Sequence, residues 1–178
     1  VLSNNKISKL KRLHFKHVKN IDFLCVDHNC LEELDEDTFY EISEVQHIRI
    51  NNNHIKTLPN NLLKNLDKLY ELCLDYNKIK SIKPEVFNHA INLLSLSLEG
   101  NQLQEIHRDL FKSQKKISSL MLNNNQISKL HPDIFTELPN LNSIHLKYNQ
   151  LTEIDEKLFR NNENIDKISL RGNKIKSV

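Results

Sequence analysis

The chain has 178 residues, with 25 Lys and Arg against 23 Asp and Glu, and a formal net charge of +2. A balance so close to neutral argues against a nucleic-acid partner or an anionic membrane surface. No apolar run approaches the ~20 residues of a membrane span. We therefore expect no nucleic acid and no membrane contact within this segment.

A repeat of 24 residues runs through the whole chain. Asparagines recur at this spacing eight times without a slip, at Asn5, Asn29, Asn53, Asn77, Asn101, Asn125, Asn149 and Asn173. A fixed period of this length is typical of one supersecondary unit that is repeated and stacked on its neighbours.

Taken in chain order, each repeat predicts a short strand, a turn at the asparagine and a return segment. Before Asn77 stand Leu69, Leu72 and Leu74, and the alternation over the last two predicts a strand with one face inward. The chain would start inside such a strand at residues 1–5, and further strands would precede each later asparagine. Ten residues after the asparagine stands a phenylalanine, or once a leucine, at Phe15, Phe39, Leu63, Phe87, Phe111, Phe135 and Phe159.

On these residues the chain resembles leucine-rich repeat proteins, in the 24-residue form with a buried phenylalanine. The resemblance implies an α/β solenoid: a horseshoe of about seven to eight repeats, with a parallel β-sheet on the concave face and an irregular or short helical convex side. The asparagines would form a hydrogen-bonded ladder, and the phenylalanines a stacked spine. We expect residues 1–178 to be a single array, uncapped at both ends and thus a fragment of a longer protein.

The concave face is the expected site of function, because sites are grafted on such rigid scaffolds. Residues six, four, two and one before each asparagine should face it, with Tyr70 at a strand start. The candidate partner-binding residues are Phe23, Asp27, His47, Arg49, Tyr70, Glu71, Asp75, Tyr76, Glu99, Met121, His145, Lys147, Tyr148, Lys167 and Arg171.

Charge on this predicted face changes sign along the array. Asp27, Glu71, Asp75 and Glu99 make one end acidic, and His145, Lys147, Lys167 and Arg171 make the other end basic. A partner of complementary charge would be fixed in register by that gradient. The alternative interpretation is an ordinary solvated sheet face, with the partner bound on the convex side or the edges.

No motif for catalysis, a cofactor or a metal is present, so we expect no enzyme. Cys25, His28 and Cys30 are close in sequence, but a tetrahedral metal site needs a fourth ligand. Cys25 and Cys73 lie two repeats apart, about 10 Å at the usual strand spacing, which is too far for a disulfide.

The resemblance extends to Toll-like receptor ectodomains, insect immune leucine-rich repeat proteins and neuronal adhesion proteins. It implies an extracellular or cell-surface recognition module that binds a protein ligand or co-receptor, in innate immunity or cell adhesion, as a homo- or heterodimer. Three unpaired cysteines and the absence of an Asn-x-Ser/Thr sequon leave an intracellular, cytoplasmic scaffold or adaptor open. A further alternative is homotypic assembly through uncapped ends, where Ile7, Leu10, Ile175 and Val178 would be exposed.

Overall fold

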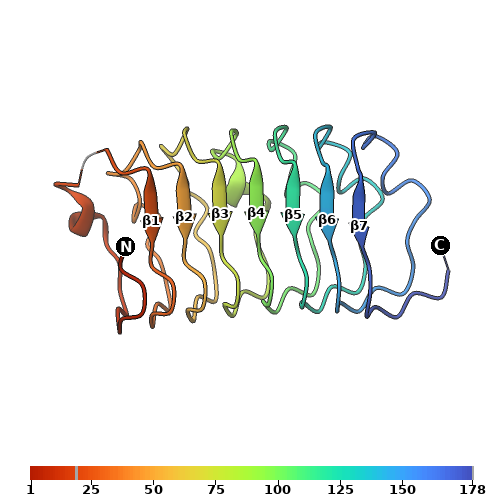
Figure 1. The fold of residues 1–178 in the computed structure, drawn as a ribbon, viewed down its shortest axis with the longest axis horizontal. Helices are drawn as coiled ribbons and strands as arrows, with labels where there is room; N and C mark the ends of the chain where they lie inside the picture. Colours follow the sequence, from red (N-terminus) through yellow and green to blue (C-terminus); the bar gives the residue numbers. More distant parts are fainter. Residues whose placement is uncertain (19, 178) are drawn as a thin grey trace.

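A computed structural model describes residues 1–18 and 20–177. Seven three-residue strands form one parallel sheet in chain order, and Figure 1 shows them in a row with the two termini at opposite ends. The strands are β1 (Phe23–Cys25), β2 (His47–Arg49), β3 (Glu71–Cys73), β4 (Ser95–Ser97), β5 (Ser119–Met121), β6 (Ser143–His145) and β7 (Lys167–Ser169).

The segment 1–5, expected as a strand, forms none. The amide of Leu2 donates a hydrogen bond to the carbonyl of Cys25 over 2.7 Å, so this segment lies beside β1 without a ladder of its own. The amide of Asn4 donates a second such bond to the carbonyl of Asp27 over 2.9 Å, but both bonds lie at positions that follow the strand in later repeats, such as Ile50 and Asn52 after β2.

The register of the sheet follows the 24-residue period. Leu72 pairs with Ile48 on one side and with Leu96 on the other, and the same offset holds at every junction from β1 to β7. Residues at the same position of successive repeats therefore lie side by side, in columns that cross the sheet.

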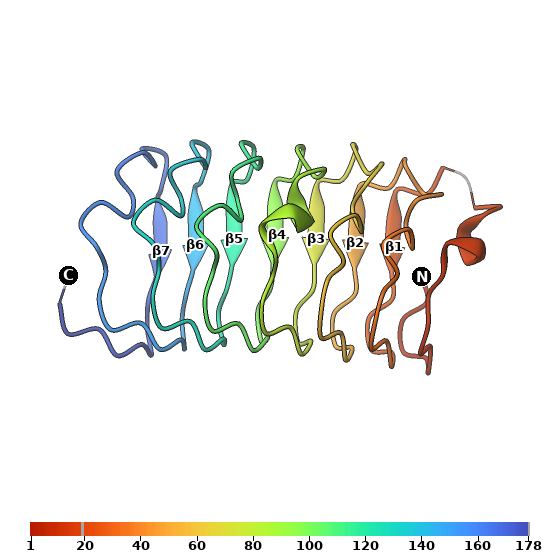
Figure 2. The same ribbon diagram turned by 180° about the vertical axis from the view of Figure 1, so that it is seen from behind.

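The back of the array consists of turns and two short 3-10 helices, η1 (Arg12–Phe15) and η2 (Pro84–Phe87). Figure 2 shows these return segments crossing behind the strands. A parallel sheet with an irregular or short helical convex side is the predicted solenoid, and this prediction is confirmed.

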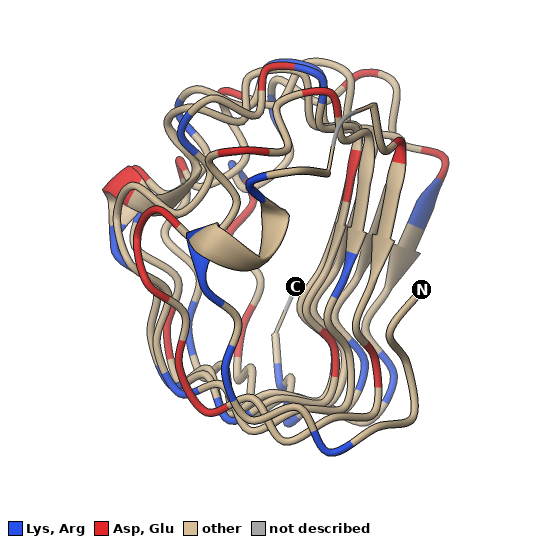
Figure 3. Ribbon diagram, turned by 90° about the vertical axis from the view of Figure 1, so that its left-hand side faces the viewer, with Lys and Arg blue, Asp and Glu red and all other residues tan. Residues whose placement is uncertain are grey.

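The core lies between the sheet and the return segments, and Figure 3 shows the turns superposed around it in a view along the array. The phenylalanine spine is confirmed: Phe39, Phe87, Phe111 and Phe135 are fully buried. Towards one end Phe159 is half-buried, and its ring stacks on Phe135 with 5.7 Å between centroids. No turn could bury these rings alone, so each depends on the next turn for its cover.

The asparagine ladder is confirmed as well. The side-chain oxygen of Asn101 accepts the amide of Ile79 at 3.1 Å, and its nitrogen donates to the carbonyls of Leu74 at 3.0 Å and Leu98 at 3.1 Å. The bonds to Ile79 and Leu74 cross to the preceding turn, the bond to Leu98 stays within the same turn, and all three satisfy buried backbone groups. The same three bonds recur at Asn29, Asn53, Asn77, Asn125, Asn149 and Asn173.

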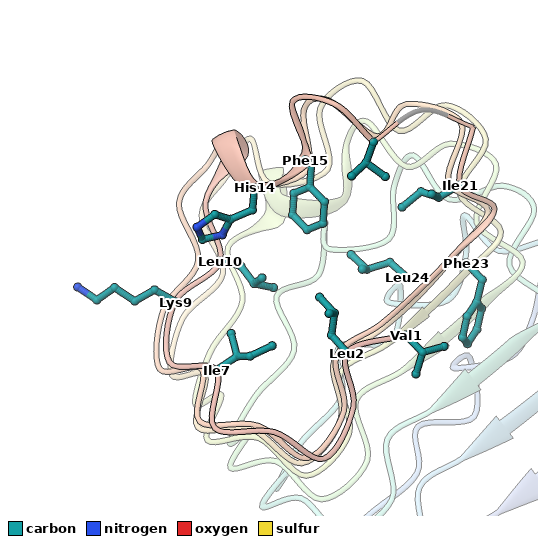
Figure 4. Close-up of a pocket in the computed structure, with 11 residues that line it drawn as sticks. Val1, Leu2, Ile7, Lys9, Leu10, His14, Phe15, Ile21, Phe23 and Leu24 are labelled. Carbon is teal, nitrogen blue, oxygen red and sulfur yellow. The ribbon is translucent and has the colours of Figure 1, made fainter.

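The expectation that Leu10 is exposed at the N-terminal end is wrong. Leu10 is only 4% exposed, and Ile7 and Ile175 are half-buried; Val178 lies outside the described residues. Figure 4 shows Leu10 pointing into the first turn, whose return segment folds over it with Phe15. What remains open at this end is a pocket of about 560 Å³ with a mostly apolar lining.

Candidate functional site

The short strands place alternate side chains on the concave face. In β3 the middle residue Leu72 is 1% exposed, whereas Glu71 and Cys73 on either side of it are half-buried. This alternation follows from the two-residue period of a strand. Because the strands are in register, the face is built of columns six and four positions before the asparagine, followed by two columns in the turn.

The structure brings all the predicted site residues to this face or its rims. The exposed ones are Phe23, Arg49, Tyr70, Tyr76, Tyr148, Lys167 and Arg171, and the half-buried ones are Asp27, His47, Glu71, Asp75, Glu99, Met121, His145 and Lys147. None is buried, so each retains some surface towards a partner. Whether a partner uses them remains a prediction.

The acidic end is less acidic than its composition indicated, because Glu71 is neutralised within the chain. Its carboxylate lies 2.9 Å from the guanidinium of Arg49 and 3.2 Å from the ring of His47. Burial opposes ionisation of Glu71, but hydrogen bonds from Cys73 and Arg49 outweigh it and lower the pKa of the carboxyl. Arg49 also lies over the ring of Phe23, 5.3 Å from its centroid.

A second ladder, which sequence reasoning missed, runs two positions before the asparagines. The carboxylate of Asp75 accepts the amide of Glu99 at 2.9 Å, and Asn51 accepts the amide of Asp75 at 2.9 Å. Asp27 and Asn123 accept the amide of the next repeat in the same way, at 2.8 and 2.9 Å. The available signal was the run of Asp and Asn at this position, the side chains best suited to accept a nearby backbone N–H.

Asp75 lies in a half-buried place without a cation beside it. Burial raises the pKa of its carboxyl, and the hydrogen bonds from Ser97 and from the amide of Glu99 only partly offset this. One carboxylate oxygen carries both of these bonds. The other oxygen accepts no bond from the part of the chain that the structure describes.

Glu99 is also held by neutral donors alone. Its carboxylate accepts hydrogen bonds from the side-chain amides of Asn123 at 2.9 Å and Asn124 at 3.1 Å, and from the hydroxyl of Tyr76 at 3.1 Å. The nearby charge of Glu99 raises the pKa of that hydroxyl. The carboxylate is therefore fixed in position and its charge is not compensated.

The basic end carries the opposite uncompensated charge. Within residues 1–18 and 20–177, no ion pair involves Lys147, Lys167 or Arg171. Burial, and then the charges of Lys167 and Lys147, lowers the pKa of His145. The imidazole is thus held neutral beside two lysines.

Some charges of the convex side and the edges are paired between neighbouring turns. Lys56 lies 3.1 Å from Glu32, and Lys68 lies 2.5 Å from Glu44. Equivalent pairs join Lys115 to Glu137, Arg160 to Asp133 and Arg12 to Glu41. Such exposed pairs contribute little to stability, and other charges of these surfaces, such as Lys83 and Lys112, are in no ion pair among the described residues.

The cysteines have no metal or disulfide partner in the described part of the chain. Cys25, Cys30 and Cys73 are free, and no group of three or more His, Cys, Asp or Glu among the described residues could hold a metal ion. Burial, and then the hydrogen bond to Glu71, raises the pKa of Cys73 to about 12. In those same ranges, no helix is long and apolar enough to cross a membrane.

Comparison with known proteins agrees with this geometry. The family model described as leucine rich repeat matches residues 1–55, 23–79, 67–120 and 115–175. The chain therefore belongs to the leucine-rich repeat family, whose repeat arrays are protein–protein interaction modules. No curated protein sequence matches the chain significantly.

Two solved structures share the fold. A chain of the TLR13–ssRNA13 complex superposes with a TM-score of 0.84 over 88% of this chain, at 25% sequence identity. A chain of the LRIM1/APL1C complex superposes with a TM-score of 0.78 over 84% of this chain, at 24% identity, which shows the fold alone. This chain spans only 22% and 28% of those chains.

Proposed function

We propose that this array is the recognition module of a secreted or cell-surface protein, and that it binds a protein ligand or co-receptor through its concave face without enzymatic activity. The observation that carries the proposal is the distribution of uncompensated charge. Asp75 and Glu99 on one half of the face, and Lys147 and Arg171 on the other, have no partner of opposite charge in the described chain, and the two signs lie on separate halves of one face.

Uncompensated, pre-positioned charges favour recognition more than stability. A carboxylate held by neutral donors, as in Glu99, is already oriented and needs no rearrangement when a cation approaches. Complementary charge across an interface accelerates association and selects the register of the partner. Exposed Tyr76 and Tyr148 beside these charges are of the residue type enriched in interfaces.

The split sign of the charge favours a protein over a nucleic acid. Neutralising a phosphate backbone requires cations along the whole track, and here Asp75 and Glu99 interrupt it. The single-stranded RNA in the TLR13 complex is bound by that protein, and its presence there does not assign an RNA ligand to this chain. An extracellular role in innate immunity or adhesion is supported by the buried phenylalanine of the repeat and by the fold shared with TLR13 and the LRIM1/APL1C complex.

The test is a binding panel of secreted and cell-surface ectodomains and of cytoplasmic proteins, with single-stranded RNA as a further analyte. The concave variant is Lys147→Glu with Arg171→Glu, and the matched control is Lys56→Glu with Lys115→Glu on the convex side and edge. We expect ectodomain ligands whose binding is lost in the concave variant and kept in the control.

Three results would contradict the proposal. Ligands that bind both variants equally would place the site elsewhere on the array. Binding of RNA alone, abolished by the concave variant, would replace the protein partner with a nucleic acid. Cytoplasmic proteins binding the concave face in place of ectodomains would favour the intracellular scaffold.

A further inference from the structure

The concave face has a charge pattern that is reversed about its fifth strand. One column reads Asp75, Glu99, Asn123, Lys147 and Arg171. The neutral Asn123 is the centre of this column. Glu99 lies one repeat before it and Lys147 one repeat after it, and Asp75 and Arg171 lie two repeats before and after it. In the column six positions before the asparagine, Glu71 and Lys167 flank three serines, but Glu71 is already paired with Arg49 of its own chain and adds no free charge to the pattern.

The uniform register turns this sequence pattern into a spatial one. Each column advances by one strand per repeat from β3 to β7, about 4.8 Å at the usual strand spacing. Glu99 and Lys147 therefore lie at equal distances from the line of β5, and so do Asp75 and Arg171. A surface whose charge is reversed about one line is complementary to itself after a half-turn about that line.

We propose that the partner recognised by this face is a second copy of the chain, docked face to face around a two-fold axis that runs along β5. The proposal rests on the proposed concave recognition and names its partner. In this arrangement β4 faces β6 of the second copy and β3 faces its β7. Every contact occurs twice, as an isologous dimer requires.

The two-fold axis pairs the charges that the single chain leaves uncompensated. Glu99 meets Lys147 of the second copy and Asp75 meets Arg171, and both pairs are duplicated by symmetry. The free carboxylate oxygen of Asp75 is available for that contact, because its internal bonds use the other oxygen. Complementary charges placed in this way steer the two copies together and fix their register.

The uncharged residues of the face fit the same axis. The half-buried Met121 lies on β5 and would meet its own copy on the axis, as an adaptable apolar contact. The exposed Tyr76 and Tyr148, whose rings rest on Gly100 and Gly172 of their own chain, would line one rim of the interface on both sides of the axis.

End-to-end stacking is the competing arrangement of two copies. It would use the apolar pocket at the N-terminal end, which Phe15, Leu24 and Ile7 line. That contact is heterologous and builds open chains of copies. It involves none of the concave charges, so the two arrangements respond to different variants.

The test is sedimentation equilibrium of the whole chain over a range of concentrations at low and high salt, with three variants. Lys147→Glu and Glu99→Lys each place like charges opposite one another twice, and each is expected to weaken the dimer by about 100-fold. The double variant Glu99→Lys with Lys147→Glu restores opposite charges across the axis, and is expected to return dimerisation to within about tenfold of the parent. Lys56→Glu is the matched control and leaves the dimer unchanged.

Circular dichroism of each variant separates loss of the dimer from loss of the fold, and Lys147→Glu is the safest probe because only its main chain joins the second ladder. A parent chain that stays monomeric overturns the proposal. So do single variants that dimerise like the parent, a double variant that fails to recover, and growth into larger species that Leu24→Glu abolishes. If the chain is monomeric yet loses ectodomain ligands in the concave variant, the dimer fails and the proposed function stands.

Discussion

The ring of Tyr76 lies directly over the Cα of Gly100 in the next repeat. A Cβ added to Gly100 would lie 2.4 Å from Cδ1 of Tyr76, and the backbone of Gly100 has φ of +65°. Tyr148 and Gly172 repeat this relationship three repeats later, also with 2.4 Å to Cδ1. The two glycines of the chain therefore leave room for the rings of two exposed tyrosines, which pack against the glycine backbone at one rim of the concave face.

Gly100→Ala is expected to lower the free energy of unfolding by about 1–3 kcal/mol, through the left-handed backbone and displacement of the tyrosine ring. In a Tyr76→Ala background the same substitution should cost less, because only the backbone part remains. Urea denaturation of the four chains of this cycle measures the difference. An equal cost in both backgrounds would mean that the ring does not rest on the glycine.

Asn101→Leu is expected to cost about 1–3 kcal/mol, because it leaves the buried amide of Ile79 without a partner and removes one of the two asparagine donors at each of the carbonyls of Leu74 and Leu98. Asn5→Leu is the matched control, since the exposed Asn5 bonds only to the carbonyls of Leu2 and Ser3. Urea unfolding should show the large loss only for Asn101. Equal losses of stability in Asn101→Leu and Asn5→Leu would show that the asparagine ladder does not stabilise the fold.

Asp75 should make the stability of the chain depend on pH in a defined direction. Burial raises the pKa of its carboxyl in the folded state, so its contribution to stability is present below the ordinary pKa and is lost as pH rises through the folded-state pKa. Asp75→Asn keeps an oxygen for the amide of Glu99 and removes the charge. We expect it to be at least as stable as the parent at neutral pH, with a difference that shrinks in acid.

Asp75→Ala completes this comparison, because it removes the acceptor together with the charge. We expect it to be less stable than Asp75→Asn by about 1–3 kcal/mol at neutral pH. Chemical denaturation of the three chains between neutral and acidic pH provides the measurement. A loss of stability in Asp75→Asn that grows with pH would show that the ionised carboxylate stabilises the fold.

The cysteines should differ in reactivity under native conditions. The pKa of Cys73 is raised to about 12, which leaves almost no thiolate at pH 8, whereas Cys30 is exposed in a turn. Iodoacetamide should therefore alkylate Cys30 well before Cys73, and the difference should vanish in denaturant. Peptide mass spectrometry resolves the two rates. Faster native alkylation of Cys73 would contradict the described burial.

The repeat made the fold predictable, since a period of 24 residues with fixed aliphatic, asparagine and phenylalanine positions leaves little freedom in the scaffold. The strands, ladder and spine lie where Leu72, Asn101 and Phe111 predicted them. The open N-terminal end was less predictable, because the burial of Leu10 depends on how its own return segment folds over it.

The candidate face was predictable as a set of positions, but its electrostatics were not. Glu71 and Arg49 are 22 residues apart and meet only because they stand in adjacent columns of neighbouring strands. Counting Glu71 as free acid therefore overstated the charge of that end. Similarly, the role of Asp75 in the second ladder could not be predicted from the sequence, because it depends on the backbone amide of Glu99 facing the carboxylate.

The central claim, that the concave face is the surface of recognition, is tested most directly by association kinetics with a protein ligand that the ectodomain panel identifies. The association rate of the parent is compared with Lys147→Glu/Arg171→Glu and with the convex control Lys56→Glu/Lys115→Glu, at low and high salt. The account predicts an association rate at least about tenfold slower for the concave variant at low salt, with no change in the control. A control that slows association while the concave variant matches the parent would contradict it.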